Sequence, residues 1–193
     1  MLRRTKGRQQ VQRLKKLLSA LTLAGFGIVS MLGSVNSEIR LPWIAQKTVT
    51  DCGRAVLAAL AARDGRDVDL IYRRIPDPSD RRRGYSIAEM QEDAEHLGVK
   101  LLLAAPELLK GDCGKREIIS AYYKQLSEVV DDGHPVVIPV VSGPSIGHYV
   151  ILVSTTSAGF RVHDPASRGL RTVTTADLEE KMCRFGFVAL IVD

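Results

Sequence analysis

The amino-acid sequence predicts an α+β domain in which N-terminal helices pack on a C-terminal antiparallel sheet. Two observations carry this prediction. Apolar residues recur mostly with helical spacing as far as residue 131, and from residue 135 they form short runs separated by turn-forming residues. Helices that precede the strands are typical of one helical layer against an antiparallel sheet. The 193 residues, 45% hydrophobic and 25% charged, suffice for one such domain and a short appendage.

The first 35 residues differ in composition from the rest. Residues 1–16 contain seven Lys or Arg and no acidic residue, and residues 17–35 contain no charged side chain. A basic segment followed by an apolar one is typical of a secretory signal peptide or signal anchor. The apolar stretch is close to the lower limit of ~17–25 residues for a membrane-spanning helix. A cleaved signal, a retained anchor and a buried helix therefore all stay open, with the anchor slightly favoured.

The basic residues of segment 1–16 predict that the remaining domain, residues 36–193, lies on the other side of the membrane. Positive charge stays on the cytoplasmic side, so we expect this domain in a periplasm or outside the cell, anchored to the inner membrane by residues 17–35 or released. The formal net charge of the chain is +5, but residues 17–193 hold 20 basic and 22 acidic side chains. A nucleic-acid-binding domain needs a basic face. No nucleic-acid partner is expected.

Helices are predicted at residues 51–63, 67–75, 86–97 and 117–131. The second ends before Pro76, because proline cannot continue a helix. The third begins with Ser86 and Glu89, which have the spacing of a capping box, and Gly98 ends it. The fourth carries an apolar stripe that indicates core packing: Ile118, Ile119, Tyr122, Tyr123, Leu126, Val129 and Val130.

Strands are predicted at residues 99–105, 135–142, 147–155, 159–165, 170–175 and 185–193, with a short helix at 176–183. The third and fourth of these strands form a hairpin that turns near residue 156 or 157. In that register His148 and Asp164 lie opposite each other or one step diagonal. Opposed Cβ atoms lie ~4.5–5.5 Å apart, which is close enough for an imidazole to meet a carboxylate. A slip of one residue would separate them.

Cys52 stands at the first turn of its helix, after Thr50 or Asp51 as the N-cap. The unpaired N–H groups and the dipole at a helix start favour a thiolate. Gly53 would leave room for a substrate to reach the sulfur. A cysteine in an apolar helix is by itself more often part of the core. Its combination with a histidine and an acid is what points to a nucleophile.

The partners of Cys52 have distinct roles. His148 could take the thiol proton or form an ion pair with the thiolate, while Asp164 orients the imidazole. Gln46 could place an amide N–H beside the backbone N–H of Cys52, which would form an oxyanion hole worth ~3–4 kcal/mol per donor. His96 and His134 are predicted to be structural or surface groups. His163 is predicted to face away from Asp164 on its strand and therefore ranks below His148 as the base.

The chain contains three cysteines, Cys52, Cys113 and Cys183. In an oxidising compartment one pair can form and leave one thiol free. We predict that Cys113 pairs with Cys183, because the proposed chemistry needs Cys52 reduced. No Cys-x-x-Cys or zinc pattern is present, and neither a metal nor another cofactor is expected.

A glutamine six residues before a cysteine that opens a helix, followed by a histidine and an acid on late strands, resembles the papain-like cysteine peptidases. The segments QKTVTDCG, GHYVIL and VHDPA are similar to the double-glycine leader peptidases, the bacteriocin-processing family (cysteine peptidase family 39). The resemblance covers about residues 41–193. It implies a papain-like fold with Cys52 as nucleophile, His148 as base, Asp164 as its orienting acid and Gln46 in the oxyanion hole.

The resemblance also implies a substrate. Family members cleave after a Gly-Gly pair at the end of a leader peptide, in a groove that admits small side chains. Most are cytosolic domains fused to an ABC exporter, whereas the targeting segment here resembles stand-alone exported members that act near secretion systems. The expected partners are therefore a peptide or protein with a Gly-Gly type junction, a secretion apparatus, and the membrane through residues 17–35. A non-catalytic leader-binding domain and a papain-fold acyl transferase stay open as alternatives.

Overall fold

The computed structural model describes residues 38–75, 84–104, 116–142, 146–167 and 169–193. Contacts divide the chain into residues 1–35 and residues 36–193, and the fold below belongs to the second unit. The basic segment (1–16) and the signal or anchor segment (17–35) lie outside the described residues, so both stay predictions. Within the described ranges, no helix has the length and hydropathy needed to cross a bilayer.

Helices dominate the first half of the domain. They are α2 (Cys52–Arg63), α3 (Val68–Arg74), α4 (Ile87–His96) and α5 (Arg116–Asp131), with strand β1 (Leu101–Ala104) before α5. The second half contains β2 (Val136–Ser142), β3 (Ile146–Thr156), β4 (Gly159–His163), β5 (Leu170–Thr174), α6 (Thr175–Cys183) and β6 (Ala189–Val192). The last strand is shorter than predicted, because residues 184–187 form a turn in which Phe187 has a positive φ of 56°.

Local signals account for where several helices begin. The Asp67 carboxylate accepts hydrogen bonds from the N–H groups of Asp69 and Leu70 at the start of α3. The predicted capping box is present in α4, where Ser86 and Glu89 each bond the other residue's backbone N–H. Gly98, at φ +66°, follows the last turn of α4.

The six strands form one antiparallel sheet in the order β1-β6-β2-β3-β4-β5. The two central strands, β2 and β3, are paired over seven residues, from Val136 opposite Leu152 to Ser142 opposite Ile146. The predicted α+β architecture, with N-terminal helices on a C-terminal antiparallel sheet, is confirmed. It places the start of β3 and the end of β4, which carry the predicted base and acid, in neighbouring strands.

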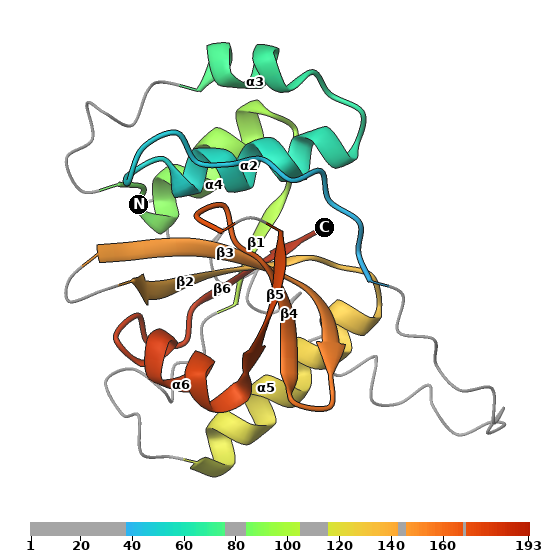
Figure 1. Cartoon of the computed structure of the whole chain (residues 1–193), viewed down its shortest axis with the longest axis vertical. Coiled ribbons are helices and arrows are strands. Elements are labelled where there is room, and N and C mark those ends of the chain that lie inside the picture. Colours follow the sequence, from blue (N-terminus) through green and yellow to red (C-terminus); the bar gives the residue numbers. More distant parts are fainter. Residues whose placement is uncertain (1–37, 76–83, 105–115, 143–145, 168) are drawn as a thin grey trace, which may run out of the picture. The chain divides into compact units, whose positions relative to one another are not determined.

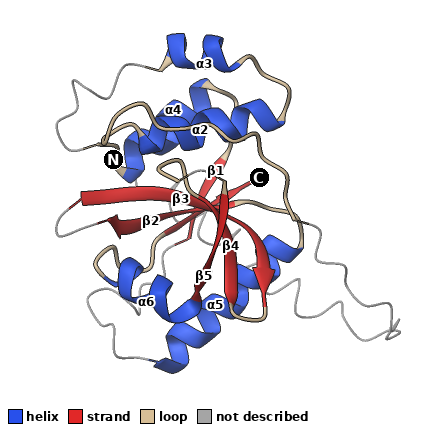
Figure 2. Ribbon diagram, viewed as in Figure 1, coloured by secondary structure: helices blue, strands red, loops and turns tan. Residues whose placement is uncertain are grey.

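The expectation of a single helical layer is wrong. Helices α2, α3 and α4 cover one face of the sheet, and α5 and α6 cover the other (Figures 1 and 2). Alternate residues of the central strands enter separate cores: Val137 and Ile151 pack with α2, whereas Val136 and Val150 pack with α5 and α6. The consecutive apolar residues of β2 and β3 are the signature of strands buried on both faces.

The apolar stripe of α5 packs into the second core as predicted. Its members Ile119, Tyr122, Tyr123, Leu126 and Val130 are buried, and Ile118 and Val129 pack partly buried against them. The rings of Tyr122 and Tyr123 meet Phe187 edge to face, with centroids 6.0 and 6.4 Å from it. The apolar stripe of α5 therefore packs against the far face of the sheet, as core residues do.

Candidate active site

Cys52 is the first residue of α2 and is buried, with 2% of its surface exposed. Asp51 occupies the N-cap position, but its side chain makes no capping bond to the helix. Instead its Oδ2 accepts from the backbone N–H of Lys47 at 3.1 Å. The carboxylate thereby stabilises the turn that precedes Cys52 and does not occupy the first-turn N–H groups. An oxyanion site at this helix start requires that arrangement.

The same turn is braced from α3 by an aromatic ring. The Lys47 ammonium lies 4.2 Å and the Arg54 guanidinium 4.4 Å from the centroid of Tyr72. Burial, helped by Asp51, raises the pKa of Tyr72 to about 12, so its hydroxyl stays neutral. Lys47 and Arg54, which lie on either side of Cys52 in the sequence, thus both contact the ring of Tyr72.

Gly53 does not provide the predicted path for a substrate. A Cβ atom at Gly53 would lie 2.7 Å from Cδ2 of Tyr85 and 2.9 Å from the sulfur of Met90. Gly53 is itself buried, so the missing side chain allows α2 to approach these two residues. The expectation is wrong because Tyr85 and Met90 already fill the space beside Gly53.

His148 and Asp164 meet as the hairpin register predicts. Strands β3 and β4 pair Ile151 with His163 and Leu152 with Val162. Continuing that register, His148 lies two residues beyond the position opposite Asp164, which is the diagonal arrangement. The two side chains are in direct contact, with His148 Nε2 at 2.7 Å from Asp164 Oδ1 and both groups buried.

Asp164 has further partners on both carboxylate oxygens. Oδ1 also accepts from the backbone N–H of Ala166 at 2.9 Å, and Oδ2 lies 2.6 Å from a guanidinium nitrogen of Arg171. Burial alone would raise the pKa of Asp164, but the bonds from His148 and Ala166 and the nearby positive charges outweigh it and lower that pKa. The carboxylate is therefore ionised at neutral pH.

Sequence reasoning missed Arg171. The signal that could have found it is the pairing of β4 with β5, which sets Arg171 opposite Val162, two residues before Asp164. Because residues two apart in a strand face the same side, a long basic side chain at 171 can reach an acid at 164.

The remaining side of the His148 ring faces the thiol. Burial would lower the pKa of His148, but hydrogen bonds with Asp164 and with Cys52, and the charges of both, raise it to about 9. Because Nε2 is bonded to Asp164, Nδ1 is the nitrogen left for the sulfur. An imidazole with this pKa is protonated at neutral pH, so the ring presents a positive charge to the sulfur.

Gln46 lies beside the same loop. Its backbone N–H donates to the carbonyl of Pro165 at 3.1 Å, and the indole N–H of Trp43 donates to the carbonyl of Ser167 at 3.0 Å. The Gln46 side-chain amide donates to the carbonyl of Thr48 at 3.0 Å. The segment that leads to Cys52 is therefore tied at two points to the turn that follows Asp164, while a role for Gln46 in an oxyanion hole stays a prediction.

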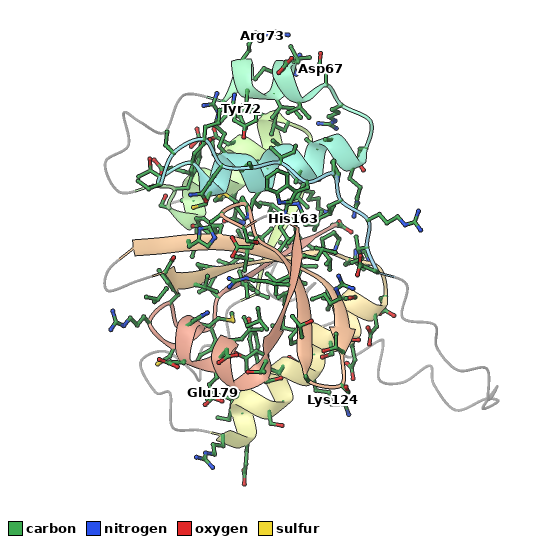
Figure 3. All side chains as sticks on the ribbon, in the orientation of Figure 1. Asp67, Tyr72, Arg73, Lys124, His163 and Glu179 are labelled. Atoms are coloured by element: carbon green, nitrogen blue, oxygen red, sulfur yellow. The ribbon has the colours of Figure 1, made fainter. Side chains whose placement is uncertain are left out.

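The other three histidines make no side-chain hydrogen bond to Cys52, His148 or Asp164 among the contacts described. His163 is buried near the centre of the domain, and burial lowers its pKa (Figure 3). Nδ1 of His134 lies 2.9 Å from the carbonyl oxygen of Val192, at the end of the sheet. His96 is exposed in the last turn of α4. His96 and His134 thus occupy a surface and a structural position, as predicted. His163 lies close enough to Asp164 for the carboxylate charge to act on its pKa.

The cysteines differ in state. Cys52 is a free thiol, and Cys183 is disulfide-bonded. Cys113 lies outside the described residues, so the pairing of Cys113 with Cys183 stays a prediction. The free cysteine is the one that contacts His148.

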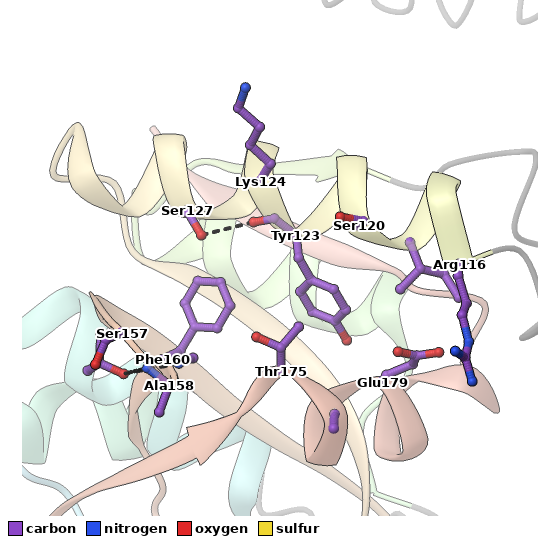
Figure 4. A pocket seen from close by; sticks show the side chains of 14 residues that line it. Arg116, Ser120, Tyr123, Lys124, Ser127, Ser157, Ala158, Phe160, Thr175 and Glu179 are labelled. Carbon is purple, nitrogen blue, oxygen red and sulfur yellow. Dashed lines mark hydrogen bonds between the residues drawn. The ribbon is translucent and has the colours of Figure 1, made fainter.

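A cavity of about 610 Å³ lies on the α5 side of the domain (Figure 4). Its wall is formed by one side of α5, the tip of the β3–β4 hairpin and the first turn of α6, with Tyr123 and Phe160 among the lining side chains. Arg116 and Lys124 bring positive charge and Glu179 negative charge to it. No residue of the Cys52–His148–Asp164 cluster contributes to this cavity.

The fold defines the class: this is the architecture of the papain-like C39 peptidase domains, and the resemblance to the double-glycine leader peptidases is confirmed. The peptidase domain of ComA, a bifunctional ABC transporter of Streptococcus, superposes with a TM-score of 0.57 at 17% identity, over 80% of this chain and 97% of that one. A double-glycine motif protease from an AMS/PCAT transporter, solved in complex with a leader peptide, gives 0.56 at 15% identity, over 82% and 95%. A C39-like peptidase from Bacillus anthracis gives 0.56 at 17%, over 81% and 98%.

Among curated proteins, the sequence is similar to the colicin V secretion and processing ATP-binding protein CvaB of Escherichia coli. The two are 29% identical over 147 residues, which is 76% of this chain and 17% of that protein's length. No protein-family model matches the sequence. The sequence and structure comparisons thus agree on one kind of domain.

Proposed function

We propose that this protein is a cysteine endopeptidase that cleaves a peptide or leader junction after a small-residue pair of the Gly-Gly type. The observation that carries the proposal is the buried contact of His148 with Asp164 on one side and with Cys52 on the other. The similarity to double-glycine peptidase domains supports a role in processing or binding peptides. No cofactor takes part in the proposed chemistry.

In the proposed reaction, Cys52 and His148 form a thiolate–imidazolium ion pair. The Cys52 thiolate attacks the carbonyl carbon of the scissile bond, and the carbonyl electron pair moves onto the oxygen, beside the Cys52 N–H and the Gln46 amide. When this intermediate collapses, the leaving amine takes the proton of His148 and a thioester remains. Water then gives a proton to His148 and attacks the thioester, which releases the acid and restores the thiolate–imidazolium pair. Asp164 holds the imidazole in place through both steps.

The location of the enzyme is part of the proposal. Residues 1–35 have the composition of a signal or anchor, and we place the domain in the periplasm, anchored to the inner membrane or released after cleavage. Its substrate is then a protein or peptide that meets it there, in association with a secretion apparatus. A signal peptide and an anchor differ in whether residues 17–35 remain in the mature chain.

The experiment that tests the activity compares the full chain with Cys52→Ala on a synthetic peptide that contains a Gly-Gly junction. We expect cleavage after the second glycine by the native chain and none by the variant, because the thioester cannot form without the sulfur. His148→Ala should lose activity as well. His134→Ala is the matched control, because this histidine bonds only to the end of the sheet among the contacts described.

Two rival functions give different results in the same experiment. A non-catalytic leader-binding domain of this fold would bind the peptide but leave it intact, and Cys52 would react slowly with iodoacetamide at neutral pH. An acyl transferase would cleave the peptide and, given an added amine, yield the amide in place of the acid. Unchanged cleavage by Cys52→Ala would contradict all proposals that use the thiol.

A further inference from the structure

The carboxylate of Asp164 is bonded on both oxygens, although only one of them serves His148. Oδ1 accepts from His148 and from the N–H of Ala166, and Oδ2 lies 2.6 Å from Arg171. The carboxylate is 6% exposed, whereas the Arg171 side chain is 43% exposed. A buried carboxylate with one bonded oxygen can rotate about its terminal bond, and a charged bond to the second oxygen opposes that rotation.

Arg171 is itself placed by the sheet. Strand β5 pairs Arg171 with Val162 and Leu170 with His163 in β4, so the backbone at 171 is fixed relative to the strand that ends just before Asp164. The guanidinium thus reaches Asp164 from a second, independent strand. The backbone N–H of Ala166, in the turn after Asp164, gives the carboxylate a third bonding partner beside His148 and Arg171.

We infer that Arg171 is a positioning residue of the active site, which holds Asp164 in the rotamer that presents Oδ1 to His148. This inference rests on the proposed function, since it assigns a task to the acid of that site. Arg171 touches neither the thiol nor the imidazole in the contacts described, so its effect passes through Asp164.

The direction in which the pKa of His148 changes when Arg171 is removed tells whether Arg171 positions Asp164 or acts only as a nearby positive charge. The groups that face His148 are Asp164 and Cys52, and those that face Asp164 are His148, Arg171 and the buried His163. If Arg171 acted only as a nearby cation, its removal would raise the pKa of His148. If Arg171 positions Asp164, its removal weakens the bond that raises the pKa of His148 most, and that pKa falls.

The test measures the pKa of His148 by NMR titration of the ring in the full chain carrying Cys52→Ser, with and without Arg171→Met. This readout needs no peptidase activity, so it can fail or succeed separately from the proposed function. We expect the pKa of His148 to fall by about 1 in the Arg171→Met chain. An unchanged or higher pKa would overturn the inference.

Arg161→Met is the matched control. Arg161 lies in β4, its side chain is 42% exposed, and it pairs with Glu38 at 3.0 Å, so the variant removes a comparable ion pair away from the triad. It should leave the His148 titration unchanged. If Arg171→Met does not fold, Arg171→Lys replaces it: a lysine keeps the charge but lacks the planar fork, and it should give a smaller fall in the same direction.

The peptidase assay then provides a second readout. With Cys52 intact, Arg171→Met should lower kcat by up to about 10²-fold with little change in KM, because a misplaced base slows the chemical step and not peptide binding. A rise in KM at constant kcat would assign Arg171 to the substrate groove and would contradict a positioning role.

Discussion

His148 lies between an acid and a thiol, and its pKa of about 9 stands well above the ordinary value of 6.5. Protonated His148 therefore stabilises the folded state fully below pH 6.5, and this contribution is lost as the pH rises through about 9. The contribution of Asp164 to folding stability depends on pH in the opposite direction. Its lowered pKa gives a contribution that is present at neutral pH and is lost as the pH falls through the folded-state value.

A pH profile of the peptidase follows from these signs. We expect kcat/KM on a Gly-Gly peptide to stay high up to about pH 9 and to fall above it, as His148 loses its proton and the ion pair disappears. The loss should be reversible when the pH is lowered. Circular dichroism over the same pH range shows whether the loss of activity comes from titration of His148 or from unfolding of the domain. An alkaline limb near the ordinary histidine value of 6.5 would mean that the ion pair does not form.

At this scale the sequence predicted three residues that the structure brings into contact, Cys52, His148 and Asp164, and it missed the contact of Arg171. Cys52 was found because a thiol at a helix start is conspicuous, and His148 and Asp164 because a hairpin turn fixes their register. Arg171 was missed, because its contact depends on the register of a second strand pair, β4 with β5, and the connection between them has no two-residue turn that would fix this register. The amide direction of Gln46 is set by its own turn, through Thr48, and no spacing rule contains that information.

At the scale of elements, the close approach of α2 to its neighbours depends on Gly53. Substitution Gly53→Ala would force Tyr85 or Met90 to move, at a cost of about 1–3 kcal/mol for overpacking. We expect a lower melting temperature by differential scanning calorimetry, together with slower alkylation of Cys52. An unchanged melting temperature with a raised KM would instead restore the interpretation of Gly53 as a substrate path.

Most elements could be predicted from the sequence because their ends carry local signals. The box of Ser86 and Glu89 marks the start of α4, and Gly98 marks its end. The arrangement of layers could not be obtained in the same way. Runs of apolar residues in β2 and β3 indicate burial on both faces, but they do not tell which helices cover each face; tertiary packing decides that.

At the scale of the whole molecule, the states of the three cysteines provide a test of the proposed compartment. Disulfides persist in oxidising surroundings such as the periplasm, and Cys183 is disulfide-bonded while Cys52 is free. We expect peptide mapping of the exported chain without reductant to find Cys113 joined to Cys183 and only Cys52 alkylated. Alkylation of Cys113 in exported protein would contradict the predicted pair. Protein retained in the cytoplasm should be alkylated at all three positions.

The two bonds that join residues 43–46 to residues 165–167 couple parts of the site that are far apart in the sequence. A peptide that displaced the segment before Cys52 would carry the turn after Asp164 along with it. Gln46 and Asp164 would then move together, and the alignment of one side chain with the other would be kept when a peptide binds.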